Sequence, residues 1–354
     1  MEGEEAAWDD LEHVYLPAAD AGALPLRLYA FVPLPSWRRL AHRVRHLGRR
    51  HPRGRLLWGG LKEFADGSLG SRTALMWAPY ADDPGCTGAS AVDRAALREM
   101  AAGAAAAGLQ VAVHAIGDRA VDEVLDAFEE VQQRLRRQEG AAGGSAGGAA
   151  GSAQPPLRIE HAQHISGPAA AARMAQLGVA ATPNPLHLLA DAPLLERRLG
   201  SERAGPGCSY ALRELLDAGV TAAFASDWPV APLEPLAALW AAEQRQPLPA
   251  ECGNGSSGST AGGCAGSAGG ATWSGPPAAL LRRGEALLAH TAAGAAAAGL
   301  EAEVGRIAPG LRADFVVLDA FPEGGAAAGA ALPRVLRTYV DGECAWGCDA
   351  AVSS

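Results

Sequence analysis

Apolar and polar positions alternate in short runs along most of the chain, and stretches with helical spacing separate these runs. Residues 111–116 are the clearest case, because alternating apolar side chains lead into His114 and a helix is predicted directly afterwards, over 120–137. Further strands are predicted at 24–33, 56–64, 157–160, 179–182 and 220–225, and further helices at 37–50, 93–108, 168–178, 210–219 and 281–299. This order predicts an α/β fold with a parallel sheet, in the form of an incomplete (β/α)8 barrel.

The same pattern divides the chain into three parts. Residues 1–23 contain no complete predicted element and are interpreted as a poorly defined tail, whereas 24–300 carry the barrel pattern. Residues 301–354 are rich in strand patterns and predict part of a small accessory β-sandwich. Two stretches of glycine, alanine and serine, 139–153 and 249–276, are predicted to be low-complexity surface insertions.

Composition narrows the classes of protein that fit. The 354 residues are 49% hydrophobic, which is enough for a large core, and the net charge of −9 argues against a nucleic-acid partner. No apolar run approaches the roughly 20 residues of a membrane span. The acidic first residues do not resemble a signal peptide. A small-molecule substrate fits this composition, and self-association into a homo-oligomer is compatible with it.

The six cysteines are scattered along the sequence, and we interpret them as free thiols of a reducing compartment, which favours the cytoplasm. Cys344 and Cys348 are close in sequence, but no second pair of cysteine or histidine residues lies near them to complete a zinc site.

Side chains of the kind that bind metals stand at the ends of four predicted strands: Lys62, His114, His161 and Asp227. The carboxyl ends of barrel strands meet at one face, where catalytic residues lie. Neutral imidazoles bind zinc, a bound metal lowers the pKa of water, and a carboxylate can move the proton to a leaving amine. A lysine fits such a site only with a lowered pKa or as the carbamate that CO2 forms. The four residues therefore predict metal-assisted hydrolysis, with Asp227 as general base and acid.

Each residue also has a plain structural interpretation. A single histidine at a strand end is commonly a core or surface residue, Lys62 alone would be solvated, and Asp227 could cap a turn. His42 and His46 share one helical face, but the arginines around them favour a solvated basic surface. The order of the four residues along one β/α series is what favours a common site.

Five stretches together resemble the amidohydrolase superfamily, and within it the amidohydrolase 3 group that includes N-substituted formamide deformylase. These stretches begin at Lys62 (KEFADGSLGSR), Val113 (VHAIGDRA), Arg158 (RIEHAQHI), Ser226 (SDWPVAPL) and Gly305 (GRIAPGLRADFVVL).

The resemblance implies a (β/α)8 barrel with a β-sandwich and a divalent metal cofactor, with zinc as the first candidate. It implies that His114 and His161 ligate the metal, that Asp227 ligates it and shuttles protons, and that Lys62 bridges or supports it. It also implies that His187 faces the substrate. Arg72 is a second candidate for orienting the substrate.

The sequence departs from the superfamily at one point, since it contains no H-x-H, the motif that binds the more buried metal at the end of the first strand. The first two strands of the barrel are also missing from the pattern. Either the chain is truncated at its N-terminus or the protein has lost this metal, and the remaining ligand positions favour truncation.

These observations predict a metal-dependent hydrolase of non-peptide C–N bonds, of the amide or formamide type. The alternative is a non-catalytic scaffold or regulatory protein on a truncated or degraded amidohydrolase fold. A barrel that handles sugars or phosphates is less well supported, because no phosphate-type loop or acidic pair stands out.

Overall fold

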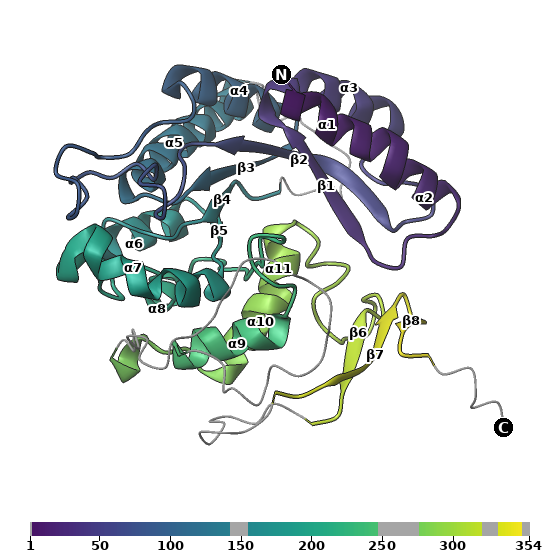
Figure 1. Ribbon diagram of the computed structural model, residues 1–354. Coiled ribbons are helices and arrows are strands. Elements are labelled where there is room, and N and C mark those ends of the chain that lie inside the picture. The colour runs from purple at the N-terminus through teal and green to yellow at the C-terminus, as the bar shows by residue number, and fades with distance from the viewer. Residues whose placement is uncertain (1, 142–154, 247–275, 321–331, 349–354) are drawn as a thin grey trace.

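A five-stranded parallel sheet forms the centre of the molecule (Figure 1). The structure is a computed structural model and describes residues 2–141, 155–246, 276–320 and 332–348. The strands lie in chain order, each parallel to the next, which confirms the α/β prediction at the level of a mixed fold with a parallel sheet. Their bounds are β1 (Leu28–Pro33), β2 (Leu56–Phe64), β3 (Gln110–Ala115), β4 (Arg158–His161) and β5 (Ala180–Thr182).

Helices between the strands cover one face of this sheet (Figure 1). Val111 and Val113 of β3 belong to one buried cluster with Val124 and Phe128 of the following helix, and all four side chains are almost fully buried. Asp93 caps one of these helices by accepting a hydrogen bond from the backbone N–H of Ala96. The covering helices are α3 (Trp37–Leu47), α4 (Arg94–Ala106), α5 (Asp118–Ala141) and α6 (Pro168–Gln176).

The opposite face of the sheet carries polar side chains, because successive residues of a strand point to opposite faces. Phe64, His114 and Glu160 are cross-strand partners in one row at the carboxyl end of the sheet. Lys62 and Arg158 both pair with Ala112 in the next row. The alternation that builds the core therefore also gathers the ionisable residues on one face.

The N-terminal residues are ordered into helices, so the prediction that 1–23 contain no complete element is wrong. They form α1 (Glu2–Asp9), a π-helical segment η1 (Asp10–Tyr15) and α2 (Leu16–Asp20). Trp8 and Leu11 are each only 1% exposed, and Trp8 donates a hydrogen bond from Nε1 to Ser36 Oγ at 3.0 Å. The acidic segment lacks a strong apolar period, and tertiary packing of these two side chains fixes it instead.

The segment predicted as a strand at 220–225 runs beside β5 without forming a regular strand. Ala222 makes an isolated parallel bridge to Ala181, and the backbone N–H groups of Ala223 and Ala225 donate to the carbonyls of Ala181 at 2.8 Å and Pro183 at 3.1 Å. β5 ends at Thr182 because Pro183 has no N–H to donate and a helix begins at Pro185. The predicted helix at 281–299 is interrupted at Thr291. The helices of this half are α7 (Pro185–Ala204), α8 (Leu212–Asp217), α9 (Pro235–Gln244), α10 (Arg283–His290) and α11 (Ala292–Ala297).

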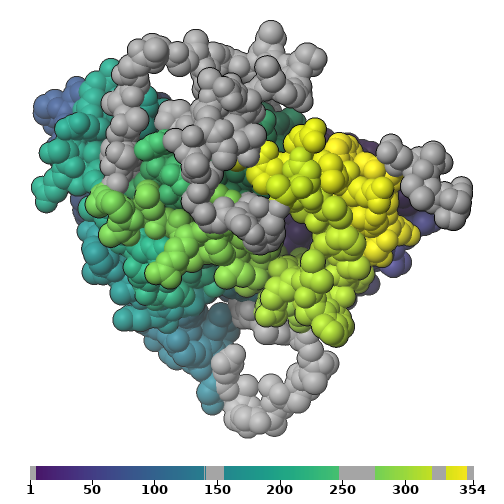
Figure 2. Space-filling view, turned by 90° about the horizontal axis from the view of Figure 1, so that it is seen from below, coloured from purple at the N-terminus to yellow at the C-terminus, as the bar shows by residue number. Residues whose placement is uncertain are grey.

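A three-stranded antiparallel sheet follows, made of β6 (Phe315–Leu318), β7 (Val335–Val340) and β8 (Glu343–Trp346). Figure 2 shows it, in yellow, at the surface of the molecule. Arg27, just before β1, ties it to the parallel sheet through ion pairs of 3.1 Å with Asp314 and 2.8 Å with Asp341. The predicted domain boundaries remain predictions.

Cys344 and Cys348 form a disulfide, so the prediction of free thiols is wrong for this pair. The turn after β8 brings their Cα atoms to 6.0 Å, within reach of a disulfide. Cys86 and Cys208 are free, as predicted. Cys252 and Cys264, and most of the two predicted insertions, lie outside the described residues. In the described part of the chain, none of the helices is both long and apolar enough to cross a membrane.

Candidate metal centre

His161 reaches the polar face by a departure from strand geometry. Glu160 already points to that face, so a regular strand would turn His161 to the core. His161 and Ala162 instead have φ of +70° and +43°, in the left-handed region that non-glycine residues rarely adopt. Such backbone conformations are concentrated at functional sites. The adjacent residues Glu160 and His161 thereby place their side chains on the same side of the sheet.

The imidazole of His161 is held by the residue that precedes α7. Its Nδ1 lies 2.7 Å from Asn184 Oδ1, and the amide nitrogen of Asn184 donates to the backbone carbonyl of Ala225 at 3.0 Å. An amide oxygen only accepts, so Nδ1 carries the proton and Nε2 keeps its lone pair. Burial lowers the pKa of His161 to about 4, although the hydrogen bond to Asn184 opposes the shift. The ring is therefore neutral at pH 7.

His161, His187 and Asp227 converge at one point. Each offers one ligand atom, and these atoms lie within 4.8 Å of one another. His187 comes from the first turn of α7, and burial lowers its pKa. Its Nε2 is buried without a hydrogen bond to the described residues and lies 3.8 Å from Asp227 Oδ2. A buried nitrogen with no hydrogen-bond partner is costly unless something else binds it.

Asp227 is the exposed member of this group, and its side chain is 42% exposed. Its φ of +58° is again left-handed. Two imidazole nitrogens and one carboxylate oxygen are the donor set that zinc and similar divalent cations take in proteins. These three residues therefore fit a divalent cation in ligand type and mutual distance, and burial keeps the two imidazoles neutral.

His114 lies beside this group but is not one of its three members. Its ring centroid is 4.5 Å from that of His161, in an edge-on arrangement. Burial lowers the pKa of His114 to about 4, and the neighbouring His161 adds to the shift. Its Nε2 donates to the backbone carbonyl of Gly67 at 3.0 Å, so its Nδ1 keeps the lone pair.

Lys62 lies one row further from the carboxyl end of the sheet than His114. Its Nζ is 3.9 Å from the centre of the Phe64 ring. Burial lowers the pKa of Lys62 to about 8, although the charges of Glu160 and Asp227 oppose the shift. A substantial fraction of this amine is therefore neutral just above neutral pH.

Arg72 is directed to a different partner. Its guanidinium donates two hydrogen bonds of 3.1 Å to the carboxylate of Asp82, which Arg198 of α7 also contacts. These pairs fasten the loop after β2 to α7. Arg72 is thus engaged in a loop contact and is not one of the three converging residues.

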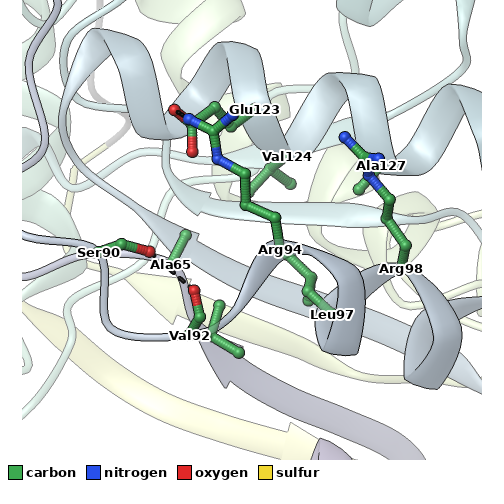
Figure 3. Close-up of a pocket in the computed structure, with 9 residues that line it drawn as sticks. All are labelled: Ala65, Ser90, Val92, Arg94, Leu97, Arg98, Glu123, Val124 and Ala127. Carbon is green, nitrogen blue, oxygen red and sulfur yellow. Dashed lines mark hydrogen bonds and ion pairs between the residues drawn. The ribbon is translucent and has the colours of Figure 1, made fainter.

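Sequence reasoning did not find Asn184, and it assigned His187 only to the substrate. The sequence feature that could have indicated both residues is the segment from Pro183 to Pro185. There β5 ends and α7 begins, next to the converging residues. A separate pocket between α4 and α5 is lined by Ala65, Leu97 and Val124 and by the ion pair of Arg94 with Glu123 (Figure 3). No member of the converging group lines it.

The parallel sheet, with two histidines and an aspartate converging at its edge, defines an α/β protein with a candidate metal centre. The chain belongs to the amidohydrolase family, whose sequence model matches residues 2–345. The family predicted from the sequence motifs is thereby confirmed.

Three curated relatives match most of the chain. It is 35% identical to "Protein LONG AFTER FAR-RED 3" of Arabidopsis thaliana, with 96% of this chain and 52% of the relative covered. It is 29% identical to "Putative amidohydrolase YtcJ" of Bacillus subtilis (81% and 46%) and 30% identical to "N-substituted formamide deformylase" of Arthrobacter pascens (82% and 46%). The chain spans about half the length of these relatives.

A solved structure supports the same class. The chain is similar to an uncharacterised metal-dependent hydrolase of Pyrococcus furiosus with a TM-score of 0.64 and 28% identity, covering 85% of this chain and 52% of that one.

Proposed function

We propose that this chain carries the centre of a metal-dependent hydrolase that cleaves non-peptide C–N bonds of the amide or formamide type. The observation that carries the proposal is the convergence of His161, His187 and Asp227 within 4.8 Å, with both imidazoles kept neutral by burial. Its fold is then a partial (β/α)8 barrel of the amidohydrolase type. Zinc is the first candidate among the divalent cations.

The residues have distinct roles in this proposal. His161, His187 and Asp227 would hold the cation, with His114 and Lys62 as further ligands or supports. When bound, the cation lowers the pKa of water and polarises the carbonyl of the scissile bond. The carboxylate of Asp227 takes the proton of the attacking water and delivers it to the leaving nitrogen, for which its exposed position is suitable. The proposal thus places His187 on the cation in addition to its predicted contact with the substrate, and Arg72, which is bound to Asp82, remains a candidate for substrate contact.

Similarity to one relative supports the proposed substrate class. The relative from Arthrobacter pascens is, by its name, a deformylase of N-substituted formamides. Hydrolysis of such a substrate yields formate and an amine, so formate release is a direct assay. The small-molecule substrate, the cytoplasmic location and self-association of the chain stay predictions.

The experiment combines metal analysis with this assay. Purified protein is expected to contain a stoichiometric divalent metal and to release formate from N-alkyl or N-benzyl formamide. His161→Ala should lose the metal, and Asp227→Asn should lower kcat by roughly 10²-fold or more. His46→Ala is the matched control, because this exposed histidine of α3 lies outside the converging group. Folded protein without metal and without formate release would overturn the proposal.

The absence of H-x-H from the sequence favours one alternative, a non-catalytic scaffold or regulatory protein. That alternative predicts that His114→Ala leaves the biological activity of the protein intact. Formate release that depends on added metal would exclude it.

A further inference from the structure

Asp66 is a buried carboxylate that the proposed chemistry does not use. It is the second residue after the end of β2 and is only 2% exposed. It accepts backbone hydrogen bonds from Leu75 at 2.8 Å, Ile116 at 3.0 Å and Gly117 at 2.8 Å. Leu75 belongs to the loop after β2, whereas Ile116 and Gly117 follow β3. One carboxylate therefore joins this loop to the end of the strand that carries His114.

Close backbone contacts surround this carboxylate, one between the two segments and one within the loop after β2. A Cβ atom at Gly117 would lie 2.0 Å from the backbone oxygen of Leu75, and a Cβ atom at Gly67 would lie 2.0 Å from Thr73 Oγ1. Only glycine fits at either position. The backbone on both sides of Asp66 therefore has little room to shift while these contacts persist.

The contacts around Asp66 also fix the position of the His114 ring. Its Nε2 donates to the carbonyl of Gly67, the residue next to Asp66, and lies 3.5 Å from Asp66 Oδ1. Both oxygens favour a proton on Nε2, so both favour the tautomer whose Nδ1 has a free lone pair. Asp66 thus acts on His114 through the position of the Gly67 carbonyl and through its own charge.

We propose that Asp66 is a positioning residue for the metal centre, which fixes the tautomer and the orientation of His114. The inference rests on the proposed function, because it takes His114 as a ligand or support of the cation. Outer residues that orient metal-binding histidines commonly change metal affinity by 10–100-fold when they are replaced.

The test compares two variants of the same loop. Asp66→Asn keeps the size of the side chain but removes its charge and one acceptor oxygen. Tyr80→Phe is the matched control, since the buried Tyr80 hydroxyl donates to the carbonyl of Ala74 at 2.8 Å and so anchors this loop without contacting His114. Metal is removed with a chelator, thermal unfolding is recorded, and Co²⁺ is titrated while its visible spectrum is followed.

Asp66→Asn is expected to weaken Co²⁺ binding by about 10–100-fold, whereas Tyr80→Phe should stay within about twofold of the unsubstituted protein at a comparable Tm. A purely structural role for Asp66 would affect both variants in proportion to their loss of stability. Equal Co²⁺ affinity of the two variants would overturn the proposal.

A second measurement works without metal. In protein with ¹⁵N-labelled histidine, the ring nitrogen shifts report which nitrogen carries the proton, and His114→Gln identifies the signal among the nine histidines. We expect His114 in the Nε2–H form in the metal-free protein, and the Nδ1–H form would overturn the proposal. The same spectrum of Asp66→Asn tests Asp66 itself: a loss of the Nε2–H form is expected, and an unchanged tautomer would also overturn the proposal. If Co²⁺ fails to bind the unsubstituted protein, the proposed function fails, whereas this comparison still tests the action of Asp66 on His114.

Discussion

Asn184 Oδ1 lies 2.7 Å from Nδ1 of His161, and this contact selects the imidazole nitrogen that is left to bind a cation. The orientation of the amide is fixed by its other end, because Nδ2 donates to the carbonyl of Ala225 at 3.0 Å. Asn184 therefore connects β4, α7 and the segment that leads to Asp227. One amide that is itself outside the converging group therefore orients His161 and ties it to the segment that precedes Asp227.

Replacement of Asn184 by alanine should weaken metal binding by about 10–100-fold, because His161 loses the acceptor that fixes its tautomer and ring orientation. Zinc titration of metal-free protein measures the change. Asn184→Asp keeps an acceptor oxygen opposite Nδ1 and should bind zinc within a few-fold of the unsubstituted protein. If both variants lost affinity equally, the hydrogen bond to His161 would not be the cause.

The N-terminal helices should contribute directly to stability. Trp8→Ala removes a side chain that is 1% exposed and carries the guanidinium of Arg39 over its ring at 3.9 Å. Truncation of a buried tryptophan costs about 3–5 kcal/mol in the free energy of unfolding, which urea denaturation followed by circular dichroism can measure. Val14→Ala is the control, because Val14 is exposed, and it should change the free energy of unfolding by no more than about 0.5 kcal/mol. Equal effects would show that residues 2–20 do not pack as described.

Regular alternation allowed parts of the sheet to be predicted closely. The strand predicted at 56–64 coincides with β2, and the helix predicted at 93–108 contains α4, because Asp93 caps its start. The sequence also placed Lys62, His114 and His161 at strand ends of one sheet. These features depend on local periodicity, which a sequence records directly.

Other features depend on contacts between distant segments and could not be found in this way. α7 contains Pro193 and a non-helical Gly200, so its pattern does not indicate a helix, and the place of His187 in the metal centre was missed with it. Trp8 is buried by packing against residues 28 positions away, such as Ser36. The role of Asn184 depends on the left-handed backbone of His161, which no residue type in the sequence reveals.

The ion pair between Glu243 of α9 and Arg283 of α10 should be important for the packing of these helices. Glu243 is 4% exposed, and its Oε2 accepts a hydrogen bond from Arg283 at 2.6 Å. Glu243→Ala leaves a mostly buried guanidinium without its partner, which costs about 3–5 kcal/mol in the free energy of unfolding. Asp217→Ala breaks an ion pair whose carboxylate is exposed, and it should cost no more than about 1 kcal/mol. Chemical denaturation of both variants measures the difference, and similar losses would contradict the prediction.

His164 should make stability depend on pH in the acidic range. The ring is fully buried, its Nδ1 lies 2.8 Å from Ser209 Oγ, and its Nε2 lies 3.1 Å from Gln163 Nε2. The hydroxyl of Ser209 donates to the carbonyl of Arg203, and the amide of Gln163 is a donor, so His164 is neutral with its proton on Nδ1. Burial, followed by the charge of Arg203, lowers the pKa of His164 to about 3.

The sign of the effect follows from the two protonation states. In the unfolded chain the pKa of a histidine is about 6.5, so below that pH the unfolded state binds a proton that folded His164 does not. The contribution of neutral His164 to the free energy of unfolding is therefore complete above pH 6.5. It is lost as the pH falls towards 3, by up to about 1.4 kcal/mol per pH unit. His164→Asn keeps a donor to Ser209 but cannot titrate. The difference in free energy of unfolding between the two proteins should therefore shrink from pH 6.5 to pH 4, as measured by urea denaturation at each pH, and a constant difference would show that His164 is not buried in its neutral form.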